Sequence, residues 1–364
     1  MLEKQRQEAG DNSQQIQAGT MIINTGIDEK RAREIVDEKL HEVIIGYSQE
    51  AHEISENRIN LFANDLIPKL VKANLLEGLK DPSIQVLLME AQRSAASTER
   101  AADYALLTEL LIHRVQKGSD RNVRAGVNHA VRIVDEITDE SLLGLTVAHS
   151  ILSFSPVSGN IKDGLRVLND LFGKISYGTL PNGNEWIEHL DVLNAVRINS
   201  MGSLKKIEEY YPEQLAGYVD VGIDKTTENF QKAIEIAKEA NLPGDILCEH
   251  ELRPEYVRLK IPNINDLDFI AIHYQSKFNL PVKTALTKKQ TDAIRSIYAL
   301  YSNDADLKNQ NIREFIKIWN ELENLKELGI WWDAIPLFFT ITPVGRVLAH
   351  ANAQRCDPTL PELN

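Results

Sequence analysis

The sequence predicts a mainly α-helical protein, built as a multi-helical bundle or as stacked helical pairs. The clearest signals follow Asp81-Pro82, an N-cap residue with a proline in the first helical turn. Apolar residues then recur at helical spacing from Ile84 to Ala95, and a second leucine stripe ends near Gly118. Two amphipathic helices of this kind cannot bury their apolar faces alone, so further helices must cover them.

The body of the chain from about Asp28 to Phe154 is expected to be nearly all helical. Asp28 lies at the start of a charged amphipathic helix, Pro68 marks a kink or a break, and Thr138 is a suitable cap for a later helix. The apolar stripes of these helices should form one core. We expect that core to contain Leu87, Leu88, Leu107, Leu110, Leu111, Val127, Val131 and Val134.

A different composition marks the N-terminal stretch GDNSQQIQAGTMIINTGI, which is polar and contains several glycines. Residues 15–24 read as one or two short strands. An isolated strand or hairpin is unstable in water, so pairing between copies of the protein is expected, with a disordered leader as the alternative. The predicted oligomerisation residues are Ile16, Ala18, Ile22 and Ile23.

Beyond the helical body, the pattern is less regular. The loop SFSPVSGN is a possible boundary, and helices are expected at about 162–172, 186–198 and 226–240, with a strand near 256–261. The predicted divisions are residues 1–27 (the N-terminal tail and strand segment), 28–155 and 156–284 (two mostly helical domains) and 285–364 (a C-terminal module).

The C-terminal module resembles the back half of a winged-helix domain. A helix opens after Thr287, an amphipathic helix runs from Ile312 to Leu328 and ends at Gly329, and a strand leads into the turn at Thr342-Pro343 and a closing helix. The middle helix should bury three of its side chains against the closing helix. These are Phe315, Trp319 and Leu325, with Val344 and Leu348 as their expected partners.

The net charge and the cysteine content limit which partners the protein can bind and in which cellular compartment it is expected. The 364-residue chain carries a formal net charge of −13, which disfavours nonspecific binding to nucleic acid or anionic membranes. Its two cysteines, Cys248 and Cys356, form no disulfide framework, so a reducing cytoplasm is expected. The sequence has no apolar run near the roughly 20 residues that a membrane span requires.

Local motifs for catalysis or metal binding are weak. Cys248-Glu249-His250 lacks a second ligand pair at the usual spacing, so neither a metal nor a cofactor is expected. Ser153, Ser155 and Ser158 do not form a G-x-S-x-G elbow, and the nine histidines are scattered. The polar residues of the central helices have two interpretations. They form a carboxylate–His–Arg site, or they are the solvent-facing side of amphipathic helices. These residues are Gln85, Glu90, Gln92, Arg93, Glu99, Asp103, Glu109, His113 and Arg114.

Aromatic residues near the C-terminus offer a candidate partner-binding surface. Trp331 and Trp332 lie close to Phe338 in an apolar stretch. They form either a plug in the core or an exposed aromatic surface that binds a protein partner.

Several of these segments resemble an uncharacterised bacterial family known only by locus labels. The similarity lies in GDNSQQIQAG, DPSIQVLLMEAQRSAA, LLTELLIHRV and the tail LFFTITPVGRVLAHAN, and it covers most of the chain. Similar N-terminal segments occur on proteins of bacterial conflict and phage-defence loci. The resemblance implies an accessory, sensing or effector role in defence and supplies no catalytic residues.

The function predicted from the sequence is that of a non-enzymatic, homo-oligomeric helical assembly protein with a further protein partner. One alternative is a DNA-binding regulator that uses residues 312–328 as a recognition helix, although acidic residues outnumber basic ones on its exposed side. Another is a metal-dependent hydrolase or nuclease whose site is assembled from distant helices.

Overall fold

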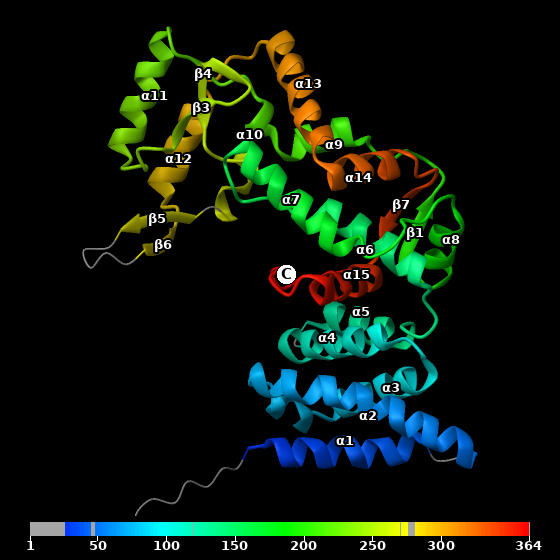
Figure 1. Cartoon of the computed structure of the whole chain (residues 1–364). Coiled ribbons are helices and arrows are strands. Elements are labelled where there is room, and N and C mark those ends of the chain that lie inside the picture. The colour runs from blue at the N-terminus through cyan, green and yellow to red at the C-terminus, as the bar shows by residue number, and fades with distance from the viewer. Residues whose placement is uncertain (1–25, 45–47, 119, 270, 276–280, 364) are drawn as a thin grey trace, which may run out of the picture.

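The computed structural model describes residues 26–44, 48–118, 120–269, 271–275 and 281–363. The predicted oligomerisation residues Ile16, Ala18, Ile22 and Ile23 lie outside this part of the chain. Figure 1 shows a stack of helices built from the N-terminal half and, at the opposite end of the molecule, a smaller lobe that contains the three-stranded sheet. The mainly α-helical class predicted from the sequence is confirmed.

The N-terminal stack is built so that each helix contacts the next helix and the one after it. Thus α1 packs against α2 and α3, α2 against α3 and α4, and α3 against α4 and α5. This pattern resembles that of helical solenoids, in which each unit buries its apolar face against its neighbours. The elements are α1 (Glu29–Ile44), α2 (Gln49–Lys72), a 3-10 turn (Leu76–Lys80), α3 (Pro82–Ser97), α4 (Ala101–Lys117) and α5 (Arg121–Arg132).

The last helix of the chain completes this stack. Helix α15 (Pro343–Cys356) contacts α4 and α5 on one side and α6 (Asp139–Ser153) on the other. In Figure 1 the red α15 lies between the cyan α4–α5 pair and the green helices α6 and α7. A helix from the C-terminus therefore takes the position that the next helix in sequence would occupy in a regular solenoid.

The local signals read from the sequence produce the expected helix ends. The Asp81 side chain accepts a hydrogen bond from the Ser83 N–H at 2.8 Å, and Thr138 accepts one from the Ser141 N–H at 3.2 Å. Helix α4 ends at Lys117, next to Gly118. Pro68, in contrast, lies inside α2 without ending it. All eight predicted core residues are buried, with Leu111 the most exposed at 3 %.

The middle of the chain continues the helical body and adds one small sheet. Strand β1 (Val196–Asn199) pairs antiparallel with β7 (Phe338–Ile341), so that Val196 lies opposite Ile341. The helix expected over 186–198 therefore ends at Val192, and after a short turn the chain continues as β1. The helices of this part are α7 (Ile161–Ile175), α8 (Glu185–Val192), α9 (Ile207–Gln214), α10 (Ala216–Val219), α13 (Ala305–Glu321) and α14 (Glu323–Asp333).

The smaller lobe has its own sheet and its own apolar core. Its strands lie in the order β2–β4–β3, all antiparallel, and Ile223, Val257, Leu259 and Ile294 are buried together beside them. The elements are β2 (Ile223–Asp224), α11 (Glu228–Glu239), β3 (Leu247–His250), β4 (Arg253–Leu259), a 3-10 segment (Ile264–Phe269), the hairpin of β5 (Ala271–Gln275) and β6 (Pro281–Ala285), and α12 (Lys288–Tyr298). The predicted strand near 256–261 corresponds to β4.

The C-terminal segment differs from the expected module. The helix predicted over 312–328 is two helices, because Leu322 has extended backbone angles, and Gly329 lies inside α14. Phe315 and Trp319 are buried as expected, and their rings pack against those of Tyr218 and Tyr211. The expected partner, α15, makes its main contacts with α4, α5 and α6.

The elements of 285–364 are also distributed over the molecule. Helix α12 packs against α11 in the smaller lobe, α13 packs against α9 and α10, and α15 lies in the helical stack. Strand β7 pairs with β1 rather than with a strand of its own segment. The winged-helix resemblance is therefore not confirmed. Among the described residues, no helix combines the length and apolar character that are needed to cross a membrane.

Candidate functional site

A cavity of about 600 Å³ lies where α6, β7 and α15 meet the C-terminal tail. Apolar side chains from three parts of the chain supply much of its wall, including Leu152, Leu204 and Phe338. Ser153, His149, His350 and Arg346 add polar groups, and Pro361–Leu363 of the tail form one side. We call this cavity the tail pocket. An apolar cavity with a few convergent polar groups is the usual form of a small-molecule site.

Four polar groups form a hydrogen-bonded chain at the tail pocket. Ser153 Oγ lies 3.1 Å from His149 Nδ1, and His149 Nε2 lies 3.3 Å from His350 Nδ1. The chain ends where His350 Nε2 lies 2.9 Å from the carbonyl oxygen of Pro361. Ser153 and His149 are one turn apart on α6, whereas His350 comes from α15. We call this chain the Ser–His–His relay.

The terminal carbonyl determines the direction of every hydrogen bond in the relay. The Pro361 oxygen can only accept, so His350 Nε2 carries a proton and, in the neutral ring, His350 Nδ1 is an acceptor. His149 Nε2 must then donate to His350, which leaves His149 Nδ1 unprotonated. Ser153 therefore donates its hydroxyl proton to His149, and the lone pairs of its oxygen remain available.

Burial keeps both imidazoles neutral. His149 is 2 % exposed and His350 is 5 % exposed. Burial lowers the pKa of His149 to about 3, and the neighbouring His350 and Arg346 act in the same direction. Burial also lowers the pKa of His350, partly offset by its bond to Pro361. Both rings are thus uncharged at neutral pH, as the hydrogen-bond directions require.

Arg346 supplies positive charge to the same cavity. It lies on α15 one turn before His350, its side chain is exposed, and it makes no ion pair with any described residue. The acidic residue of the lining, Glu362, accepts a hydrogen bond from Gln116 Nε2 at 3.2 Å. The arrangement can therefore hold an apolar group against the walls and an anionic or carbonyl oxygen near Arg346 and Ser153.

Comparison with known proteins adds one result. The model of an uncharacterised family, known by locus labels, matches residues 26–360. The chain belongs to this family. No curated protein and no solved structure matches the chain. The match confirms the resemblance to this family over residues 26–360, and the segment GDNSQQIQAG lies outside it.

The three residues of the predicted aromatic partner site do not lie on one surface. Trp331 and Trp332 are 6 % and 2 % exposed, and their indole N–H groups donate to the carbonyl oxygens of Pro181 at 2.8 Å and Lys205 at 2.9 Å. The two indoles are thus core residues, which corrects the interpretation as an exposed partner surface. Phe338, in contrast, is half-buried and lines the tail pocket.

The polar residues of the central helices do not form one site. Gln92, Asp103 and Arg114 are buried, which corrects the expectation that they lie on a solvated side. Their bonds are separate: Gln92 Nε2 donates to the Val36 carbonyl oxygen, Asp103 accepts from Thr98 and Arg100, and Arg114 donates to Ser83 Oγ. Each of these three side chains joins neighbouring parts of the helical stack.

The Cys248-Glu249-His250 segment also has a structural explanation. His250 is fully buried, its Nε2 lies 2.9 Å from the Asp220 carbonyl oxygen, and its Nδ1 accepts from the Leu252 N–H at 3.2 Å. Both ring nitrogens are therefore engaged by the backbone. Within the described residues, histidine, cysteine and acidic side chains nowhere form a group of three that could bind a metal ion.

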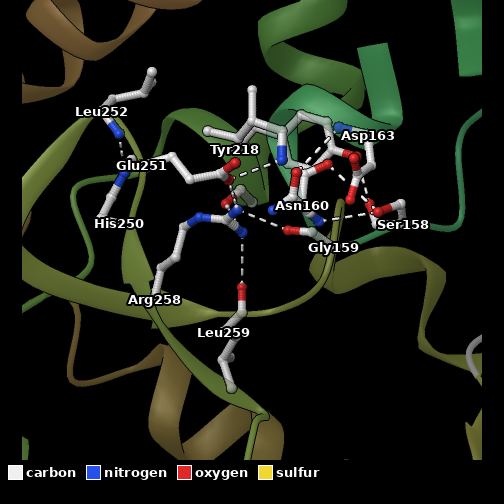
Figure 2. Close-up of polar contacts among 12 residues, drawn as sticks. Ser158, Gly159, Asn160, Asp163, Tyr218, His250, Glu251, Leu252, Arg258 and Leu259 are labelled. Carbon is white, nitrogen blue, oxygen red and sulfur yellow. Dashed lines mark hydrogen bonds and ion pairs between the residues drawn. The ribbon is translucent and has the colours of Figure 1, made fainter. Parts of the chain in front are cut away.

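A second buried polar cluster joins the smaller lobe to the helical body (Figure 2). The fully buried Arg258 of β4 donates through Nη2 to Glu251 Oε2 and to the Gly159 carbonyl oxygen, both at 2.7 Å. Its Nη1 donates to the carbonyl oxygens of Leu259 at 3.1 Å and Gly217 at 3.3 Å. We call this cluster the Arg258 joint.

Helix α7 begins at the same cluster. Glu251 Oε2 also accepts a hydrogen bond from the Ile161 N–H, at 2.8 Å, so a carboxylate lies at the positive end of α7. A side chain at Gly159 would overlap the carbonyl oxygen of Lys260. Because Arg258 is fully buried and makes four hydrogen bonds within the protein, we assign the Arg258 joint to stability.

Sequence reasoning could not have found the Ser–His–His relay. His149 and His350 are 201 residues apart, and their contact depends on the position of α15 beside α6. The one local signal is the spacing of His149 and Ser153, which places both on one helical face.

Proposed function

We propose that the chain is a helical assembly protein that acts by binding and holds a small amphipathic anion in the tail pocket. The observation that carries this proposal is the construction of the pocket. One wall is α15, which contacts α4, α5 and α6, and another is the C-terminal tail, which Gln116 of α4 contacts through Glu362. A ligand in the pocket would therefore contact the elements that hold the helical stack together.

The ligand class follows from the lining. Leu152, Leu204 and Phe338 offer an apolar surface for an alkyl chain, and burying such a chain contributes about 0.8 kcal/mol per CH₂ group. Arg346, which makes no ion pair within the described part of the chain, offers a guanidinium for a carboxylate. A medium-chain fatty acid has both features.

Dodecanoate should bind the purified full-length chain with one site per protomer, as measured by isothermal titration calorimetry. The Arg346→Met variant should bind about tenfold or more weakly, because a hydrogen bond to a charged group contributes about 1.5–3 kcal/mol. Arg313→Met removes an equal charge from an exposed position on α13 and should leave the affinity unchanged. Equal affinities for the parent and Arg346→Met, or no binding to either, would contradict the proposed ligand class.

Self-association is proposed to involve the N-terminal segment. The four predicted oligomerisation residues are apolar and stand in a polar stretch too short for a core of its own, and the family match begins at residue 26, just after it. Helix α1 follows directly, and its exposed side carries ion pairs such as Arg33–Glu29 at 2.8 Å and Arg31–Glu38 at 3.0 Å. This charged side of α1 is suited to solvent, so the apolar residues that precede it are the better candidates for contact between copies at this end of the chain.

Changing Ile16 and Ile22 together to Asp should lower the mass of the assembly measured by light scattering after size exclusion. The reason is that charges placed in a shared apolar contact are costly to desolvate. The helical circular-dichroism signal should stay close to that of the parent. An unchanged mass would show that this segment is only a leader.

The same double variant tests the biological setting. The N-terminal resemblance supports an accessory, sensing or effector role in phage defence, in a bacterial cell. If assembly serves defence, cells that express the parent should plate phage less efficiently than cells that express the double variant. Equal plating efficiency would argue against this setting while leaving the assembly itself intact.

A further inference from the structure

We propose that Ser153 is an acylation site, which accepts an acyl group from an activated acyl ester whose chain lies in the tail pocket. The proposal rests on the proposed ligand pocket and adds a covalent step to it. Three observations support it: the Ser–His–His relay, the exposed position of Ser153 at the end of α6, and the guanidinium of Arg346 at the same cavity.

The relay has the components of an activated nucleophile. A nucleophilic serine needs a base within hydrogen-bond reach and a third group that orients the base. Here His149 Nδ1 is the base, at 3.1 Å from Ser153 Oγ, and His350 orients the base by accepting the proton on His149 Nε2. The bond from His350 to Pro361 holds the orienting ring in the required tautomer.

The chemical step balances without a further reagent. Ser153 Oγ forms a bond to the carbonyl carbon of the ester as its proton moves to His149 Nδ1. The negative charge that develops on the carbonyl oxygen is stabilised by the Arg346 guanidinium, which lines the same cavity. The bond from carbon to the leaving oxygen then breaks, and the proton on His149 passes to that oxygen. The products are an ester on Ser153 and a free alcohol.

The acyl group should remain on Ser153 after transfer. Hydrolysis of the new ester requires a water molecule to lose its proton to the same imidazole. Burial lowers the pKa of His149 to about 3, so His149 is a weak base. An activated ester with a good leaving group can react under these conditions, whereas the serine ester, a poorer acyl donor, hydrolyses slowly. We therefore expect one acylation per chain rather than repeated turnover.

The test uses p-nitrophenyl decanoate and the purified full-length chain. The expected result is a burst of about one equivalent of p-nitrophenolate per chain, with one decanoyl group added to the intact mass and located on Ser153 by peptide mapping. Ser153→Ala should abolish the burst. Ser155→Ala changes an exposed serine two residues away that lies outside the relay, and it should react like the parent.

A pair of variants at His350 separates positioning from simple structural support. His350→Asn keeps an oxygen acceptor where Nδ1 accepts from His149, so most of the acylation rate should remain. His350→Leu removes the acceptor, and the rate should fall by about tenfold or more. Unfolding by heat, followed by circular dichroism, checks that both variants are folded. Equal rates for the two folded variants would overturn the role of His350.

The pH profile provides an independent test of the base. The charged and titratable groups that face the relay are Arg346 of α15, Glu362 of the tail and His113 of α4, which lies near His350. Because the pKa of His149 is lowered to about 3, the ring is unprotonated at every higher pH. The acylation rate should therefore stay level from about pH 8 to about pH 5. A rate that halves near pH 6.5, the ordinary value for histidine, would contradict a base whose pKa is lowered by burial, as that of His149 is.

The outcomes distinguish the acylation of Ser153 from the binding of a ligand in the tail pocket. If the parent binds dodecanoate but is not acylated, or if Ser153→Ala is acylated like the parent, the acylation site is wrong and the ligand pocket stands. If the parent neither binds dodecanoate nor reacts, both proposals fail.

Discussion

Replacing Arg258 with methionine should lower the free energy of unfolding by about 3–5 kcal/mol, the usual loss when one partner of a buried ion pair is removed. Arg258 is fully buried and donates to one carboxylate and three backbone carbonyl oxygens. Methionine fills similar space but donates no hydrogen bond. The Glu251 carboxylate then keeps the Ile161 N–H but loses its buried cation, and the three carbonyl oxygens lose the guanidinium as a donor.

The loss should be concentrated at the contact between the smaller lobe and the helical body. Gly159 and Glu251 connect Arg258 to the start of α7, and Gly217 connects it to α10. Hydrogen exchange should therefore rise most in β3, β4 and the first turn of α7. The free energy itself is measured by urea unfolding of the full-length chain.

A matched control lies two residues away. Lys260 makes an ion pair with Asp245 at 2.9 Å, and their side chains are 42 % and 70 % exposed. Exposed ion pairs contribute about 0–1 kcal/mol, so Lys260→Met should change the free energy of unfolding by no more than that. If Arg258→Met costs as little as Lys260→Met, the Arg258 joint does not stabilise the contact between the lobe and the body.

The parts of the fold that the sequence predicts well depend on local interactions. Asp81 and Thr138 cap their helices because an N-cap needs only a side-chain oxygen and the N–H groups of the next turn. The leucine stripe around Leu110 is buried because its spacing places it on one face of α4. These features are properties of a few consecutive residues.

The parts that the sequence does not predict depend on contacts between distant segments. Residues 196–199 are a strand because β7 lies beside them, more than a hundred residues later in the chain. Trp331 and Trp332 lie in a helix that packs against α7, although their aromatic character favours a strand. Tertiary packing outweighs local propensity at both places.

The same limit applies to polar residues. Asp103 and Gln92 look like surface residues because charged and amide side chains are seldom buried without partners. Their partners are visible only in the fold: Gln92 bonds the Val36 carbonyl oxygen 56 residues away. The Ser–His–His relay is a further case, because His149 joins a hydrogen-bonded chain only where α15 places the imidazole of His350 beside it.

Replacing Leu110 with alanine should destabilise the protein by about 2–5 kcal/mol, the range observed for large-to-small changes in packed cores. Leu110 is 0 % exposed, and α4 contacts α2, α3, α5 and α15. Rigid neighbours on several sides limit how far the structure can relax into the cavity, which places the expected loss toward the upper part of the range. Urea unfolding followed by circular dichroism measures it.

The position of α15 against α4 adds a second expected effect of Leu110→Ala. Because a C-terminal helix covers α4, the cavity in Leu110→Ala should weaken the contact of α15 with α4 as well as the contacts among the N-terminal helices. Hydrogen exchange should therefore increase in α15 as well as in α2 and α3. Leu61→Ala is the matched control, because Leu61 of α2 is 50 % exposed and its removal should cost well under 1 kcal/mol. Similar losses for the two variants would show that α4 does not lie at the centre of the packed stack.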